Sequence, residues 1–112
     1  MTDPRFTKLA KLLIGYSTEL KKGEHILLDL IDIPDEFSIE LIRAVRAVDA
    51  VPLVETRHSR ISREIVFGTN SKHAALVRDV EMHRMKKVQA YIAMRGSSNA
   101  NESSDVPMAC TE

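Results

Sequence analysis

Residues 24–32 read EHILLDLID and carry apolar side chains at both odd and even positions. A strand with one solvated face alternates apolar and polar residues, whereas a strand covered on both faces reads as a nearly continuous apolar run. The stretch therefore predicts a strand that is buried on both faces. Pro34 ends this strand, because proline has no backbone N–H to donate to a sheet ladder.

A helix is predicted before this strand. Asp3 followed by Pro4 is typical of a helix start, since the carboxylate accepts from the first N–H groups and proline fits the first turn. Gly23 is expected to supply the left-handed stop after two lysines. The expected apolar stripe of this helix consists of Phe6, Leu9, Ala10, Leu13 and Tyr16.

A second helix is predicted after Pro34, with Asp35 and Glu36 placing negative charge in its first turn. Its outward side is expected to carry Glu40, Arg43 and Arg46. Its apolar stripe consists of Phe37, Leu41, Val45 and Val48.

The rest of the chain alternates strands and helices. The expected bounds are a strand over 52–57, a short helix capped by Ser59 and ending at Gly68, a longer helix from Asn70 or Ser71 to about Lys87, and a strand over 88–95. This alternation predicts an α/β fold, a three-layer βαβ domain with a short parallel sheet in the order 2-1-3 and helices on both faces. We expect this domain to span residues 1–96. Residues 97–112 are rich in Ser, Asn, Asp and Glu and predict a polar loop or linker tail.

Composition narrows the function classes. Sixteen basic residues balance sixteen acidic ones, and aromatic residues make up 4% of the chain. A general nucleic-acid binder normally shows a basic excess and stacking aromatics, so we expect no nucleic-acid partner in spite of the basic stretches 57–63 and 84–87. Cys110 is the one cysteine, which excludes an internal disulfide framework. No apolar run approaches the ~18 residues of a membrane span, and the start carries no signal core, so the expected location is the cytoplasm.

Four short motifs follow one another along the chain: DPRFTKLA at 3–10, LIDIP at 30–34, RAVR at 43–46 and YIAMRGSSNANESSDVP at 91–107. Together they resemble the aminopeptidase T type of metalloaminopeptidase, also called the thermophilic metalloprotease family. The resemblance implies an N-terminal α/β domain of a longer, usually dimeric enzyme that removes N-terminal residues from peptides. It also implies two divalent metal ions, zinc, cobalt or similar, held by Glu, His, Asp and Tyr residues of a C-terminal domain.

No catalytic or metal-binding residue is carried over to this chain, because the matching positions belong to that C-terminal domain. The chain is therefore expected to be truncated and inactive alone. A natural truncation, a fragment and a genuine short protein all remain open.

The residues themselves offer little separate chemistry. His73 and His83 lie ten residues apart on one predicted helix, about 15 Å at 1.5 Å per residue, which is too far to share a metal ion. Asp79 and His83 lie four apart and predict a surface pair. Cys110 and the serines of the tail lack the strand-to-helix elbow that activates a nucleophile.

The most site-like positions are the carboxyl ends of the three strands, where open α/β sheets bind ligands. Arg95 is suited to grip a carboxylate, or else to pair with Glu102 or Asp105 of the tail, and Asn99 offers an amide to a peptide backbone. The candidate cleft-lining residues are Asp32, Arg57, His58, Arg95, Gly96 and Asn99.

Two functions are expected from these observations. The first is a non-catalytic domain of a metal-dependent aminopeptidase that serves as scaffold, domain contact and cleft wall, with a peptide substrate only in the full-length enzyme. The second is a stand-alone interaction or small-ligand-binding module without enzyme activity. In either case we expect a homodimer that contacts no membrane.

Overall fold

Strand β1 (His25–Ile31) lies inside a four-stranded sheet with the order β2-β1-β3-β4. The computed structural model describes residues 3–96 and 108–110. Strands β2 (Val51–Arg57) and β3 (Ala90–Arg95) pair with β1 in parallel, one on each side. The predicted α/β fold and the 2-1-3 order of the parallel strands are therefore confirmed.

The fourth strand, β4 (Met108–Cys110), runs antiparallel to β3. The expectation of a loop throughout 97–112 is wrong at these three residues. Backbone N–H and C=O groups at a sheet edge pair with an added strand whatever its side chains are. A three-residue strand is too short to show the alternation by which strands are recognised in a sequence.

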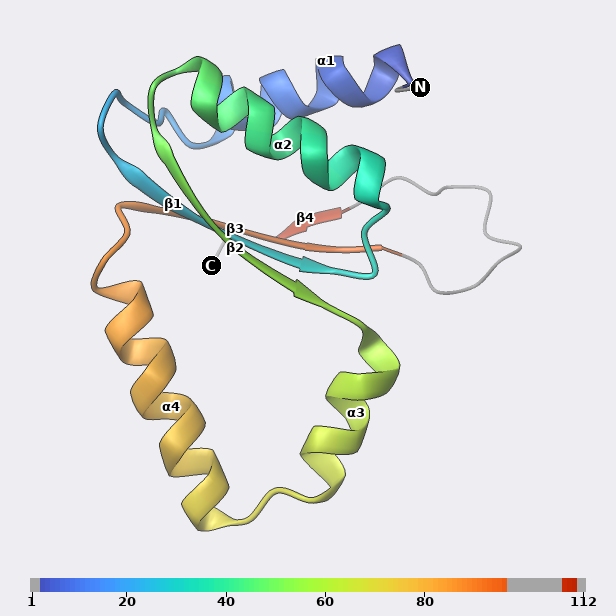
Figure 1. The fold of residues 1–112 in the computed structure, drawn as a ribbon, viewed down its shortest axis with the longest axis vertical. Coiled ribbons are helices and arrows are strands. Elements are labelled where there is room, and N and C mark those ends of the chain that lie inside the picture. The colour runs from blue at the N-terminus through green and yellow to red at the C-terminus, as the bar shows by residue number, and fades with distance from the viewer. Residues whose placement is uncertain (1–2, 97–107, 111–112) are drawn as a thin grey trace.

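Helices α1 (Pro4–Leu12) and α2 (Asp35–Ala47) cover one face of the sheet, as Figure 1 shows. A five-residue π-helical segment, η1 (Leu13–Ser17), continues α1. The side chains between these helices and the sheet form the core of the molecule. Its large members that are almost fully buried are Ile14, Ile26, Leu28, Leu30, Phe37, Leu41, Val45, Ile92 and Met94.

The first helical stretch is shorter than predicted. It ends at Ser17, where the Thr18 hydroxyl donates to the carbonyl of Ile14 at 2.7 Å and so satisfies one of the last helical acceptors. Gly23 does have a positive φ of 84°, but it lies in the turn before β1 and does not end the helix. Tyr16 is 79% exposed, because the π-helical turn shifts it away from the apolar stripe.

Helix α2 buries the predicted apolar residues Phe37, Leu41 and Val45. Glu40, however, does not point outward as predicted. It is buried, and its carboxylate accepts from the Thr7 hydroxyl at 3.2 Å and from the Arg43 guanidinium at 3.1 Å. The contact with Thr7 links α2 to α1, and a helical pattern within one segment cannot reveal a partner on another helix.

Helices α3 (Ser59–Phe67) and α4 (Ser71–Met85) lie on the other side of the sheet and extend away from it (Figure 1). Neither helix contains a buried residue. Asn70 caps α4 as predicted, since its side chain accepts from the His73 N–H at 2.9 Å. The second side of the sheet thus carries helices, but they do not form a closely packed layer.

Candidate functional site

The carboxyl ends of β1 and β2 meet at Asp32, which follows β1. Its backbone N–H donates to the Arg57 carbonyl at 2.9 Å, and its φ is 56°. Its carboxylate accepts from the Ser59 N–H at 3.2 Å, in the first turn of α3. The Nδ1 atom of His58 lies 4.0 Å from the same carboxylate oxygen. Asp32, and not Ser59 as predicted, therefore supplies the capping oxygen for α3.

The Asp32 carboxylate is held in its charged form. Hydrogen bonding from Ser59 is the largest cause that lowers its pKa, and the positive charges of His58 and Arg95 lower it further. The carboxylate is thus an acceptor near neutral pH and not a proton donor. It also completes the N-terminus of α3, where negative charge is favourable.

An open groove of about 590 Å³ lies beside this carboxylate. Asp32, His58 and Ser59 contribute to it from the strand ends, and α3 adds the rest of the wall with Arg60, Ile61 and Glu64. Ser59 is hydrogen-bonded to Asp32 and not to the imidazole, so the three residues do not form a relay that would activate a serine nucleophile. The charged and hydrogen-bonding side chains of the groove are suited to bind polar groups.

Gly96 and Arg95 stand at the end of β3. The Gly96 N–H donates to the Ile31 carbonyl at 2.8 Å, and a Cβ added at Gly96 would overlap the carbonyl oxygen of Asp32. Arg95 is exposed and lines a smaller groove of about 240 Å³ together with Ile31 and residues of α3 from Ser59 to Val66. Asn99, the remaining candidate, lies outside the described residues, as do the acids proposed to pair with Arg95.

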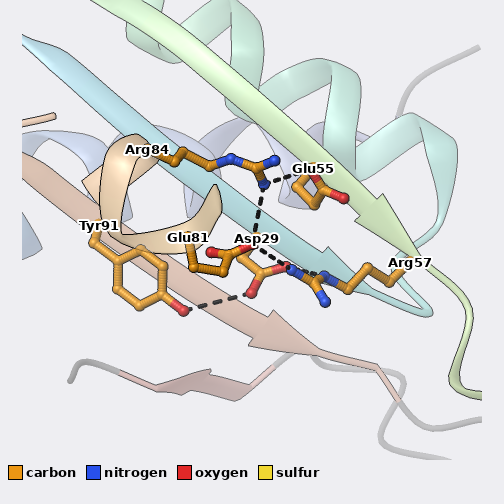
Figure 2. A network of polar contacts seen from close by, with 6 residues as sticks. All are labelled: Asp29, Glu55, Arg57, Glu81, Arg84 and Tyr91. Atoms are coloured by element: carbon orange, nitrogen blue, oxygen red, sulfur yellow. Dashed lines mark hydrogen bonds and ion pairs between the residues drawn. The ribbon is translucent and has the colours of Figure 1, made fainter. Parts of the chain in front are cut away.

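Arg57 lies at the rim through its backbone, but its side chain contacts acidic residues on the face of the sheet that α4 approaches. Its Nε donates to Asp29 Oδ1 at 2.9 Å, and its Nη2 lies 3.6 Å from Glu81 Oε2 on α4 (Figure 2). The Tyr91 hydroxyl lies 3.4 Å from the other oxygen of Asp29. Asp29 on β1 thus contacts a side chain from each neighbouring parallel strand, Arg57 on β2 and Tyr91 on β3.

Arg84 completes this polar network. Its Nη1 donates to Glu55 Oε1 at 2.6 Å and lies 3.5 Å from Glu81 Oε2. Burial, followed by the neighbouring Asp29 charge, raises the pKa of Tyr91. The network therefore holds α4 against the sheet through charged side chains.

The sequence analysis missed this network, although its signals were present. Asp29 interrupts the apolar run of β1, and Glu55 and Arg57 occupy alternate positions of β2. Residues in register on parallel strands point to the same face, so these groups share one face of the sheet. The sequence does not show this register, because the paired residues of β1 and β2 lie more than twenty residues apart along the chain.

The described residues do not provide a metal centre. Within 3–96 and 108–110, no group of three or more His, Cys, Asp or Glu side chains is placed to hold a metal ion. In the same part of the chain, no helix is both long and apolar enough to cross a membrane. No protein-family model, curated protein or solved structure matches this chain.

Proposed function

We propose that this chain is a non-catalytic α/β domain of a metal-dependent aminopeptidase of the aminopeptidase T type, which removes N-terminal residues from peptides. The order and spacing of the four sequence motifs support the assignment, and the parallel 2-1-3 sheet is of the class that the resemblance implies. The metal ions would be held elsewhere in the enzyme, because the described side chains do not fit a metal centre. The role of the domain is that of scaffold, domain contact and cleft wall.

One observation carries the domain role. Helices α3 and α4 expose nine large apolar side chains on the side of the sheet opposite α1 and α2. Exposed large apolar side chains in this number on two neighbouring helices favour a contact with further polypeptide. The nine residues are Ile61, Ile65, Val66, Phe67, Leu76, Val77, Val80, Met82 and Met85.

The strand-end groove supports the cleft-wall role. It offers a carboxylate that stays charged, an exposed imidazole and, at the neighbouring groove, the Arg95 guanidinium. Such groups bind the amide and carboxylate groups of a peptide through hydrogen bonds.

The mass of the native protein tests the proposal directly. An antibody raised against the purified chain would isolate the protein from its source, and mass spectrometry would then read its peptides. We expect a protein much larger than 12.6 kDa whose additional peptides contain Glu and His metal ligands. A native mass of 12.6 kDa would contradict the domain role.

An activity assay adds a second test. The purified chain, supplied with zinc, cobalt or manganese, is expected to show no turnover of aminoacyl chromogenic substrates, because no metal-bound water can be activated. Turnover that persists through further purification would overturn the non-catalytic assignment.

Arg95 gives the sharpest test of the cleft wall. In the full-length enzyme, Arg95→Ala is expected to raise KM several-fold, about 1 kcal/mol for a lost charged contact at an exposed site, with kcat unchanged. Lys86→Ala, which removes an exposed charge after α4, serves as the control. Equal KM values for the two variants, with equal melting temperatures, would remove Arg95 from the cleft.

A second candidate function is a stand-alone module that binds a small ligand or a partner. The open groove of about 590 Å³ favours it, because this volume is typical of small-ligand sites. The native mass separates the two candidates, since only the stand-alone module predicts 12.6 kDa.

A further inference from the structure

A separate groove of about 440 Å³ lies between α3 and α4, on the side of the sheet away from α1 and α2. Ligand sites in proteins usually enclose about 300–1,000 Å³ and combine an apolar lining with a few polar groups. Its lining residues come from both helices and the end of β2, and are Arg57, Ser62, Ile65, Val66, Thr69, His73, Ala74, Val77 and Arg78.

Four of the lining residues, here called the apolar floor, are apolar: Ile65 and Val66 from α3 and Ala74 and Val77 from α4. Helical backbone groups bond within their own helix and leave nothing for the amides of an extended peptide, which would lose their water without a partner. A hydrocarbon chain has no amide groups, so it loses no hydrogen bonds to water when it lies on this floor.

The charged groups of the groove are all of one sign. Arg57 and Arg78 line it, and no carboxylate does. The strand-end groove, in contrast, contains Asp32 and Glu64, and a third groove along α4 contains Asp79 as well as Arg78, which borders both grooves on this helix. The groove between α3 and α4 therefore complements an anion, whereas these two do not.

Arg78 contributes most of this unbalanced charge. Arg57 already donates to Asp29 and lies near Glu81, so its charge is partly neutralised. Arg78 is exposed and forms no ion pair with any residue in 3–96 or 108–110. Its guanidinium presents paired N–H donors that match a carboxylate.

The polar groups at the far end of the groove are already occupied. The Thr69 hydroxyl donates to the Ile65 carbonyl at 2.8 Å and lies 3.3 Å from His73 Nδ1. Because the hydroxyl hydrogen is used, the threonine oxygen accepts from Nδ1–H of His73. Recognition in the groove therefore depends on the arginines, the Ser62 hydroxyl and the apolar floor.

A helix of several turns is larger than the groove and would lie largely outside it. One turn of an α-helix, about 10 Å across and 5.4 Å long, fills roughly 400 Å³, which is almost the whole groove. A single unbranched chain with a charged end fits the same volume at greater length.

We propose that the groove between α3 and α4 binds an unbranched alkyl carboxylate, with its chain on the apolar floor and its carboxylate at Arg78 and Arg57. The inference uses only residues of this chain. It requires that the groove stays open while the other exposed apolar residues of α3 and α4 contact further polypeptide.

The test is a titration of the uniformly ¹⁵N-labelled full chain with decanoate, followed by the chemical shifts of backbone amides. Decanol and decyltrimethylammonium, which have the same chain length, serve as the neutral and cationic probes. We expect saturable shifts centred on Ile65, Val66, Ala74 and Val77, with decanoate binding about tenfold more tightly than either probe at low salt. Added salt is expected to reduce the difference, because the arginines are partly exposed.

Two matched pairs of variants locate the site. Arg78→Glu is expected to weaken decanoate binding about 3- to 10-fold, whereas Arg60→Glu, the same charge change outside the groove, leaves it unchanged. Val77→Ser is expected to weaken binding by a smaller factor, and Val80→Ser is its control. Val77 and Val80 belong to the same helix and are 45% and 47% exposed, but only Val77 lines the groove.

Three results would each overturn the proposal: no saturable binding of decanoate, decanol binding as tightly as decanoate, or equal effects of Arg78→Glu and Arg60→Glu. Saturable shifts centred on the strand-end residues, with the groove amides unchanged, would also overturn it.

Discussion

Gly96 and Asp32 decide how closely the ends of β1 and β3 approach each other. Gly96 lies where its missing side chain leaves room for the Asp32 carbonyl. Asp32 adopts a φ of 56°, a conformation that aspartate and asparagine tolerate better than most residues. The strand-end site therefore needs a glycine at position 96, where a side chain would not fit. It also needs Asp32, whose backbone N–H and carboxylate both form hydrogen bonds.

Replacement of Gly96 by Ala is expected to lower the free energy of unfolding by about 1–3 kcal/mol, because backbone must move to admit the added Cβ. Urea denaturation of both proteins measures the change. Gly15→Ala is the matched control, since nothing lies within 4 Å of a Cβ added there. Equal losses in the two variants would contradict the close approach at Gly96.

The Asp32 carboxylate is expected to make stability depend on pH in acid. Its pKa is lower in the folded chain than in the unfolded chain, so the unfolded chain binds more protons as the pH falls below about 4. The stabilisation is present above that pH and is lost as the pH falls through the lowered pKa. Asp32→Asn keeps the backbone conformation available and removes the charge.

Denaturant titrations between pH 2 and pH 7 would compare Asp32→Asn with the unmodified chain. The difference in unfolding free energy is expected to be largest near neutral pH and to shrink toward pH 2. A difference that stays constant with pH would show that Asp32 acts through its backbone alone.

At the scale of elements, α1 and α2 are held by burial, whereas α4 is held by charge. The first pair packs on the core face of the sheet with Phe37 and Leu41 fully buried. Helix α4 contains no buried residue and contacts the sheet through Glu81 and Arg84. Apolar burial is worth more than exposed ion pairs, so α4 is expected to be the less stable element.

Arg84→Gln is expected to speed hydrogen exchange in α4 with little change in β1. A double-mutant cycle with Glu55→Gln is expected to give a coupling of about 0.5–1 kcal/mol, since both side chains remain partly exposed. Lys72→Gln, at the start of α4, is the control. Exchange that is unchanged in α4 of Arg84→Gln would show that the ion pairs do not hold the helix.

At the scale of the whole molecule, the edges of the sheet are partly protected from pairing with other strands. The apolar side chains of α3 and α4, in contrast, are exposed. Strand β4 pairs with Ala93, Met94 and Arg95 and so covers part of the outer edge of β3. On β2, the Val51 N–H donates to Glu24 at 2.8 Å on the β1 side, so the next residue, Pro52, faces the outer edge. Proline offers no N–H there, which disfavours pairing with another strand.

Self-association is therefore expected through α3 and α4 and not through the sheet. Phe67→Ser removes the large apolar side chain that is 78% exposed on α3 and is expected to weaken a dimer. Leu12→Ser, which changes an exposed leucine on α1, is the control. Sedimentation equilibrium over at least a tenfold concentration range measures the mass, and a constant 12.6 kDa for the unmodified chain would contradict the dimer.

Local pattern was enough to predict most elements of this fold. Each predicted helix and parallel strand exists, and the capping residues Asp3 and Asn70 accept from the N–H groups expected of them. These features depend on contacts within a few residues, which are readable in one segment. The end of the first helix differed because the π-helical turn and the Thr18 hydroxyl terminate it before Gly23.

The alternation of helices and strands and the apolar strand β1 follow from the local sequence pattern, and the expected 2-1-3 order of the parallel strands is confirmed by the structure. Three features appear only in the tertiary structure. Glu40 is buried beside Thr7, the Arg57 side chain contacts Asp29, and α3 and α4 line a groove with apolar and basic residues. The difference lies in how far apart in the sequence the interacting residues are. Helix periodicity and strand burial are set by neighbours in the chain, whereas each of these contacts joins residues from different elements and depends on how those elements come together in space.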